Sequence, residues 1–197
     1  MIIRLGKISL RLSDFPNFLN SWLVKWGAEE TEYLEMQGIH LTAFDFPEED
    51  LKNFIKKVCR WGNYAGIGGR VLNQNDIGMI RENFISACKA LNSKHPDIRK
   101  AISKINQIKN LGTPSFASKH LRMLQPQICP VLDSIIYKGI AKYPFDPEGY
   151  AQFSGDCLEI ASNLQKNRIV NPRAREAGKW FAADVEGAIF EYLQTKT

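Results

Sequence analysis

Apolar residues recur every three or four positions through most of this chain, which is the spacing of one face of a helix. The pattern is clearest over 47–61, where the apolar residues on one face are Leu51, Phe54, Ile55 and Val58. Acidic residues open this segment, and they stabilise a helix start because the helix dipole leaves that end partly positive. The same spacing predicts helices over 17–26, 76–91, 97–110, 115–124, 134–142, 150–166 and 179–194.

Other segments are patterned differently. Residues 1–11 alternate in part between apolar and polar side chains, which predicts a short strand. Residues 27–40 are mostly polar and predict a connection or a short helix. Residues 62–75 are rich in glycine, and we predict a loop there because glycine favours turns over helix interiors. The chain is therefore expected to be one mainly α domain spanning residues 1–197, without a large sheet.

The composition is that of a folded protein, with 44% hydrophobic and 24% charged residues. The net charge of +5 favours polyanionic partners, because each phosphate that a basic side chain neutralises releases counterions. A surface with a surplus of lysine explains the same charge without any partner. No apolar run approaches the length of a membrane span, and residues 1–18 lack the apolar centre of a signal peptide. We therefore expect a cytoplasmic protein that does not enter a membrane.

The cysteines, Cys59, Cys88, Cys129 and Cys157, are far apart in the sequence. They form no Cys-x-x-Cys pair, so zinc sites and iron–sulfur clusters lack their usual spacing. We expect reduced, buried thiols, no metal site and no cofactor.

The segment 97–124 predicts two helices joined by a tight turn, Leu111-Gly112-Thr113-Pro114. The backbone N–H groups at the start of the second helix would form a binding site for one phosphate. Most helical hairpins are plain packing units, so the pattern alone is weak support for DNA binding.

The run Leu111-Gly112-Thr113-Pro114-Ser115-Phe116-Ala117-Ser118-Lys119-His120-Leu121-Arg122, followed by Val131-Leu132-Asp133, resembles the helix-hairpin-helix DNA glycosylases, particularly their 8-oxoguanine branch. In that family a glycine-containing hairpin leads into a helix, and an extended apolar link then delivers an aspartate to the start of the next helix. The interval from Ala117 to Asp133 fits this layout. The resemblance implies a two-lobed helical domain, with a helix-hairpin-helix motif at about 97–124 and a cleft between the lobes.

The resemblance also implies a catalytic role for Asp133. Breaking an N-glycosidic bond creates positive charge at C1′, which a fixed carboxylate stabilises while it orients a water molecule. An ordinary helix N-cap is the alternative role for Asp133, and the two are compatible. Bifunctional family members carry a nucleophilic lysine where this chain has Ser115. Lys119 lies one helical turn later on the same face, either as a nucleophile or as a phosphate-binding residue.

Further contacts follow from the same resemblance. The residues expected to contact DNA near the hairpin are Gly112, Thr113, Ser115, Ser118, His120 and Arg122. In the glycine-rich segment, Arg70 and Asn73 are candidates for filling the gap left by an extruded nucleotide or for reading the opposite base. The aromatic candidates for the base pocket are Trp61 and Trp180. Pro114 stands where the family usually has a second glycine, which removes one N–H from the predicted phosphate site.

The sequence therefore predicts a DNA glycosylase that flips a modified base out of duplex DNA and hydrolyses its glycosidic bond. The base is either an oxidised purine such as 8-oxoguanine or a hypermodified base of phage DNA, removed as antiviral defence. We expect a monomer that associates with the nucleoid when bound to DNA. A non-catalytic helix-hairpin-helix module that binds DNA is the first alternative. The absence of the family lysine at Ser115 supports it, and the presence of the family aspartate, Asp133, argues against it. A helical adaptor that binds protein through apolar faces is the second.

Overall fold

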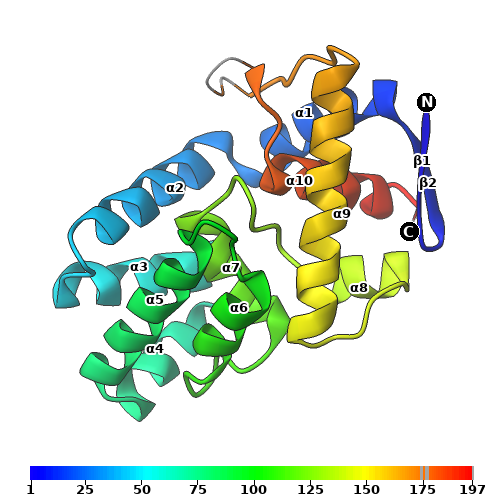
Figure 1. Ribbon diagram of the computed structural model, residues 1–197. Coiled ribbons are helices and arrows are strands. Elements are labelled where there is room, and N and C mark those ends of the chain that lie inside the picture. Colours follow the sequence, from blue (N-terminus) through cyan, green and yellow to red (C-terminus); the bar gives the residue numbers. More distant parts are fainter. Residues whose placement is uncertain (174, 176–177, 197) are drawn as a thin grey trace.

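The computed structural model describes residues 1–173, 175 and 178–196, and it is mainly helical (Figure 1). The chain begins with an antiparallel hairpin of β1 (Ile2–Leu5) and β2 (Ile8–Arg11), in which Leu5 pairs with Ile8. A short 3-10 turn follows at Leu12–Asp14. The helices are α1 (Phe15–Trp26), α2 (Ala28–Ala43), α3 (Glu48–Trp61), α4 (Ala65–Gln74), α5 (Ile77–Leu91), α6 (Ile98–Asn106), α7 (Pro114–Leu124), α8 (Ser134–Ile140), α9 (Pro147–Lys166) and α10 (Ala182–Gln194).

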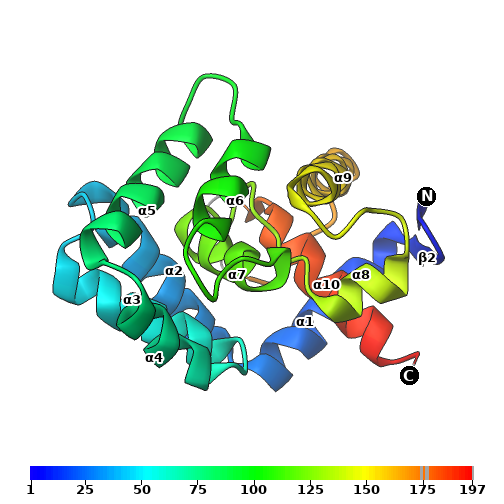
Figure 2. The ribbon, with the colours of Figure 1, turned by 90° about the horizontal axis from the view of Figure 1, so that it is seen from below.

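The helices gather in two groups that are connected through α9 and α10. Figures 1 and 2 show α2–α7 on one side, and α1, α8, α9 and α10 beside the hairpin on the other. Both chain ends lie on the hairpin side (Figure 1). The hairpin is held to α8 by a hydrogen bond of 2.9 Å from the Lys7 amide to the Ile140 carbonyl.

Two glycines allow pairs of helices to approach each other closely. A Cβ on Gly38 of α2 would lie 2.1 Å from the Met123 carbonyl oxygen of α7, so no other residue fits there without backbone movement. A Cβ on Gly187 of α10 would lie 3.1 Å from the Trp22 ring of α1. These contacts bring α2 against α7 and α10 against α1. The side chains of α10 are buried almost throughout, including the carboxyl groups of Asp184, Glu186 and Glu191.

The helices predicted from apolar periodicity are confirmed, with small shifts at their ends. Side-chain caps mark several starts: Asp76 accepts a hydrogen bond from the Met79 amide at 2.9 Å, and Asp97 accepts one from the Lys100 amide at 2.8 Å. The predicted helix over 97–110 ends earlier, at Asn106, and the chain then turns with Asn110 at a φ of 73°. The predicted strand over 1–11 is instead a hairpin.

The loop predicted before α5 was wrong. Residues 62–75 are not a loop, because α4 occupies Ala65–Gln74. Val71 is buried and Ile67 packs against the core, and these anchors outweigh the helix penalty of glycine, about 1 kcal/mol per residue. Gly68 also lets α4 approach α3 closely, since its Cβ would lie 3.3 Å from the Lys56 Cα of α3. Residues 27–40 were predicted as a connection or a short helix; the helix is confirmed, and it runs further than predicted, to Ala43.

The four cysteines, Cys59, Cys88, Cys129 and Cys157, are free and buried, as the sequence predicted. None of the helices in the described part of the chain is long and apolar enough to cross a membrane.

Candidate functional site

A pocket of about 180 Å³ lies where α1, α3, α7, α10 and the start of α8 meet. Its aromatic lining consists of Trp22, Trp26, Trp61 and Phe190. Its charged lining consists of Lys119, Asp133 and Glu186. The structure thus brings together both predicted catalytic residues, Lys119 and Asp133, and one of the two predicted base-pocket residues, Trp61.

Asp133 is held at the pocket by the start of α8. Its Oδ1 accepts hydrogen bonds from the Ile135 and Ile136 amides, both at 3.0 Å, so the predicted N-cap is confirmed. Both bonds use Oδ1, which leaves Oδ2 outside the cap. The link before α8 is tied to α7, because the Leu132 amide donates to Ser118 Oγ at 3.1 Å. A half-buried carboxylate with a fixed orientation therefore faces the pocket.

Lys119 reaches the same pocket from α7 and is only 8% exposed. Its Nζ donates to the Ser115 carbonyl oxygen at 3.4 Å and lies 5.5 Å from the centre of the Tyr64 ring. Burial lowers the pKa of Lys119, while the charges of Asp133 and Glu186 act in the opposite direction. An amine with a lowered pKa is closer to the neutral form that acts as a nucleophile.

Glu186 extends from α10 to the pocket and is 3% exposed. Its Oε2 lies 3.7 Å from Arg122 Nε, which is too far for a hydrogen bond. This oxygen has no hydrogen-bond partner among the described residues. Burial raises the pKa of Glu186 to about 8, and the charge of Asp133 adds to this effect. Arg122, Lys119 and a backbone hydrogen bond from Val131 oppose it only partly.

Arg122 lies directly behind the pocket and is completely buried. Its guanidinium carbon is 5.4 Å from the centre of the Trp22 ring and 5.2 Å from that of Trp61, so it contacts two aromatic walls of the pocket from behind. Its Nη1 also donates to Glu35 Oε1 at 3.1 Å. Arg122 therefore links the walls of the pocket to the charged groups on α2.

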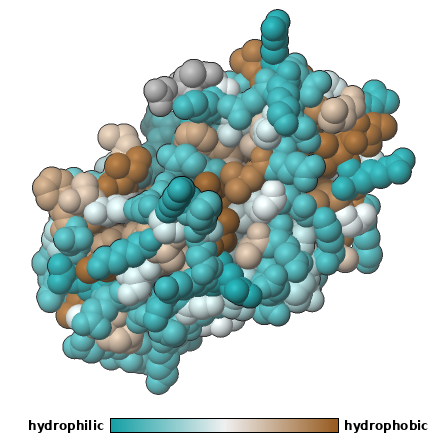
Figure 3. Space-filling model, viewed as in Figure 1, coloured by the Kyte–Doolittle hydropathy of each residue, from teal (hydrophilic) through white to brown (hydrophobic). Residues whose placement is uncertain are grey.

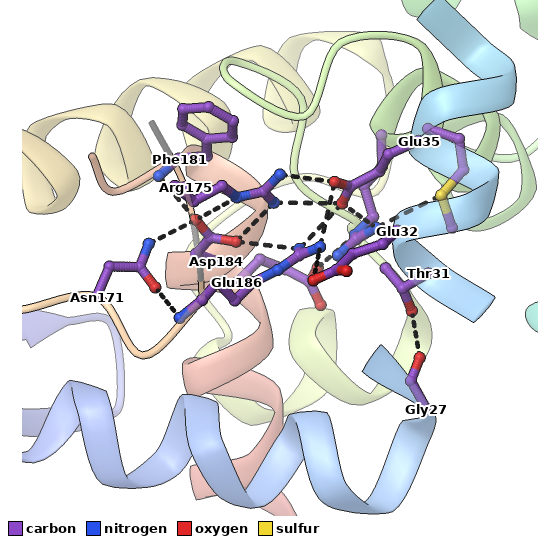
Figure 4. Close-up of polar contacts among 12 residues, drawn as sticks. Gly27, Thr31, Glu32, Glu35, Asn171, Arg175, Phe181, Asp184 and Glu186 are labelled. Atoms are coloured by element: carbon purple, nitrogen blue, oxygen red, sulfur yellow. Dashed lines mark hydrogen bonds and ion pairs between the residues drawn. The ribbon is translucent and has the colours of Figure 1, made fainter. Parts of the chain in front are cut away.

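Figure 4 shows a network of ion pairs around Glu35, Arg175 and Asp184, which Arg122 joins through Glu35. Glu35 also accepts hydrogen bonds from Arg173 Nη1 at 3.1 Å and from Arg175 Nη1 at 2.7 Å. Asp184 of α10 pairs with the same two arginines, at 3.3 Å and 2.8 Å. Burial alone would raise the pKa of Glu35, but the three arginines together hold it at about 2. The network joins α2, α7 and α10 through ion pairs.

The predicted DNA contacts of α7 are contradicted for three residues that lie inside the protein. Arg122 is enclosed by the network, and Ser118 Oγ accepts the Leu132 amide. His120 is fully buried, with Nδ1 at 2.9 Å from the Phe116 carbonyl oxygen, and burial lowers its pKa to about 4. A neutral imidazole enclosed by the core cannot reach a phosphate. These residues face inward because α7 is covered by α2, α3 and α6.

The other predicted DNA contacts lie at the surface. Gly112 and Thr113 are exposed and Ser115 is half-buried. Arg70 and Asn73 are exposed on α4. The end of α4 lies beside the turn between α6 and α7, because Asn75 exchanges two hydrogen bonds with the Lys109 backbone, of 2.9 Å and 3.1 Å.

Trp180 is not part of the pocket, so this base-pocket prediction was wrong. It is 3% exposed, packs edge-on against Phe15 and donates from Nε1 to the Ile169 carbonyl oxygen at 2.8 Å. Trp61 does line the pocket, and its orientation is set by a bond of 3.0 Å from its Nε1 to Thr31 Oγ1.

The sequence analysis missed Trp22, Trp26, Phe190 and Glu186. Trp22 and Trp26 are four residues apart, which places both on one face of the helix that was predicted over 17–26. Glu186 was visible as a carboxylate between apolar and small residues in the helix predicted over 179–194. A charged residue on a buried helix is a signal for a functional site, since burial of an unpaired charge is costly.

Among known protein families, curated proteins and solved structures, none matches this chain. The chemistry of the pocket therefore rests on its own residues. Within the described part of the chain, no group of three or more His, Cys, Asp and Glu side chains is placed to hold a metal ion.

Proposed function

We propose that the protein is a DNA glycosylase that extrudes a modified base from duplex DNA and hydrolyses its N-glycosidic bond with Asp133. The observation that carries this proposal is the position of Asp133. The aspartate on which the family resemblance depends lies in a pocket lined by aromatic rings, with Lys119 beside it. The link between α7 and α8 that delivers it was expected from the same resemblance.

The aromatic walls suit a flipped base. Stacking of a base on an aromatic side chain contributes about 1–3 kcal/mol, and it offsets the few kcal/mol needed to unstack a nucleotide from the duplex. Trp22 and Trp61 are held by the guanidinium of Arg122 behind them, so they are in place before a base arrives. Trp26 is 41% exposed and would contact the base or its sugar at the entrance.

Asp133 would act on the sugar. Its half-buried position places it nearer to solvent than the almost fully buried Glu186, so a base that enters the pocket keeps C1′ near Asp133. The carboxylate stabilises the positive charge that develops at C1′ and orients the attacking water. Lys119 is an optional participant, because Ser115 occupies the position of the family nucleophile.

In this proposal the DNA surface consists of α4 and the turn between α6 and α7, and α6, the turn and α7 act as the helix-hairpin-helix motif. The exposed Gly112 backbone would bind one phosphate before the start of α7, while the Thr113 amide already donates to the Leu111 carbonyl oxygen at 2.9 Å. Arg70 and Asn73 of α4 lie on the adjoining surface and would contact the duplex next to the pocket. In this proposal the pocket opens into the cleft between the lobes.

Base release is the direct test. The protein is incubated with duplexes that carry one 8-oxoguanine or one hypermodified cytosine, and alkali-labile abasic sites are measured. We expect a product with one of these classes, and we expect Asp133→Asn to abolish it while DNA binding survives. Activity that persists in Asp133→Asn would overturn the assignment. Release of 8-oxoguanine would indicate repair of oxidised DNA, and release of the hypermodified cytosine would indicate defence against phage.

A non-catalytic DNA-binding module is the second candidate, favoured by Ser115 at the position of the family lysine. It predicts salt-dependent binding to DNA without base release from any duplex. A protein-binding adaptor would show neither salt-dependent binding to DNA nor base release. The face of the molecule in Figure 3 is mainly hydrophilic, with its apolar side chains in several separate patches.

A further inference from the structure

We propose that Glu186 is the general acid that protonates the departing base; this inference rests on the proposed glycosylase function. Asp133 and Glu186 would then divide the reaction between them. Asp133 acts on the sugar side of the scissile bond, and Glu186 acts on the base side. Enzymes that cleave glycosidic bonds commonly use two carboxyl groups in this way, one charged and one protonated.

The position of Glu186 supports this division. It comes from α10, and Asp133 comes from the start of α8, so two separate elements bring two carboxyl groups to one pocket. Glu186 is 3% exposed and lies among Trp22, Trp61 and Phe190. A base stacked on these rings presents its ring nitrogens and exocyclic groups to the deeper carboxyl group.

Glu186 also has an oxygen available for a ligand. Its Oε2 has no hydrogen-bond partner among the described residues, although it is buried and faces a pocket. Arg122 Nε lies 3.7 Å from this oxygen, beyond hydrogen-bond distance, and the bond from Arg122 to Glu35 is made by a different atom, Nη1. A buried polar atom without a partner is costly unless a ligand satisfies it, and a protonated carboxyl offers a bound base both a donor and an acceptor.

Burial keeps Glu186 protonated at neutral pH against the two cations that face it. Burial raises its pKa to about 8, and the negative charge of Asp133 adds to the rise. Arg122 and Lys119, both on α7, oppose the rise. The titratable groups that face Glu186 from α9 are Tyr150 and Cys157. Two carboxyl groups with separated pKa values are the arrangement expected of an acid and its charged partner.

The O–H bond of Glu186 breaks, and its proton goes to a ring nitrogen or an exocyclic oxygen of the base. The C1′–N bond breaks, and its electron pair stays with the base. Water adds its oxygen to C1′ and gives a proton to Asp133. Asp133 then releases that proton to solvent while Glu186 takes one up, so the enzyme returns to its starting state. The substrate class is a base that departs poorly as an anion.

The test compares wild-type protein with Glu186→Gln, which preserves size and removes the acidic proton. Single-turnover base release is measured from about pH 6 to 10, with the 8-oxoguanine duplex and the hypermodified-cytosine duplex. The wild-type rate constant should fall as pH rises through about 8, as Glu186 loses its proton. Glu186→Gln should be about 10²- to 10⁴-fold slower at neutral pH, with unchanged duplex affinity and without the alkaline decline.

A matched control is Glu191→Gln. Glu191 also lies on α10 and is 1% exposed, but it pairs with Lys25 outside the pocket. This variant should keep the wild-type rate and pH profile. If Glu186→Gln does not fold, as judged by its thermal unfolding, the wild-type pH profile decides alone, and a rate that does not fall between about pH 7 and 9 overturns the proposal.

The outcomes separate the two proposals. If the wild-type protein releases a base and Glu186→Gln matches its rate and pH profile, the role of Glu186 is wrong while the glycosylase function stands. If the wild-type protein releases no base from either duplex, the proposed function fails and the role of Glu186 fails with it.

Discussion

Arg122 donates a hydrogen bond of 3.1 Å to Glu35, a residue 87 positions earlier in the chain, and both side chains are buried. The same guanidinium contacts the Trp22 and Trp61 rings, so one side chain connects the ion-pair network to the walls of the pocket. The stability of the fold and the shape of the pocket therefore depend on the same group.

Removal of the Arg122 charge should destabilise the protein strongly. In Arg122→Met the side chain keeps most of its length, but Glu35 loses one buried partner and the tryptophans lose a cation. Breaking a buried pair from one side costs about 3–5 kcal/mol in unfolding free energy. Urea unfolding measures this loss. Arg70→Met serves as the control, because Arg70 is exposed and its replacement should change stability by about 0.5 kcal/mol or less. Equal stability of the two variants would contradict a structural role for the network.

His120 should make the protein less stable in mild acid. Its pKa is lowered by burial to about 4, from an ordinary value of 6.5 in the unfolded chain. As pH falls from about 6.5 to 4, the unfolded chain binds a proton that the folded protein does not, so the free energy of unfolding decreases by about 3 kcal/mol. His120→Leu should remove this contribution.

Unfolding free energies at about pH 7 and pH 4.5 measure the effect of His120. His40→Leu is the matched control, because His40 is exposed on α2 and should leave the wild-type dependence on pH intact. If His120→Leu and wild-type protein lose the same stability between these pH values, the buried neutral imidazole is not its source.

The sequence predicted the helices well because their apolar spacing is a local property. Asp133 was predicted as a helix cap for the same reason, since the aspartate and the apolar run after it are neighbours in the chain. The burial of Arg122 was not predictable in this way. A helical arginine is ordinarily exposed, and only the distant Glu35 makes its burial tolerable. The helix α4 was missed because Gly68 serves a packing contact with α3 that sequence patterns do not reveal.

Arg70 should contribute to DNA affinity through phosphate contact. Arg70→Ala is expected to weaken duplex binding to a similar extent for different sequences, and to reduce the slope of log affinity against log salt by about 1. Fluorescence anisotropy at several salt concentrations measures both quantities. Arg11→Ala is the control, since Arg11 is an exposed arginine on β2, on the opposite side of the molecule (Figure 1). A larger effect of Arg11→Ala would place the DNA surface elsewhere.

Lys119 should not form a covalent intermediate with the substrate. If Asp133 directs water to C1′, reduction with borohydride during the reaction leaves no protein–DNA adduct on a denaturing gel, and strand breaks appear only after alkali. An adduct that forms with wild-type protein and disappears in Lys119→Met would instead make Lys119 the nucleophile. The lowered pKa of Lys119 supports this alternative, because a larger fraction of its amine is neutral at a given pH than in an exposed lysine.

The two roles of Asp133 are separable by choice of substitution. Asparagine is as good an N-cap as aspartate, so Asp133→Asn should retain the bonds to the Ile135 and Ile136 amides and keep the stability of α8. It removes the negative charge that stabilises C1′, so base release should be lost. Asp133→Ala should lose base release and, in addition, about 1 kcal/mol of unfolding free energy.

Asp146 provides the matched control for these variants. It caps α9 through a bond of 2.9 Å from the Gly149 amide, and it does not line the pocket. Asp146→Ala should therefore lose about as much stability as Asp133→Ala while base release continues at the wild-type rate. Thermal unfolding and the alkali-labile-site assay, run on all three variants, decide the point. If Asp133→Asn releases base as fast as wild-type protein, the cap is the whole role of Asp133, and the carboxylate takes no part in the chemistry.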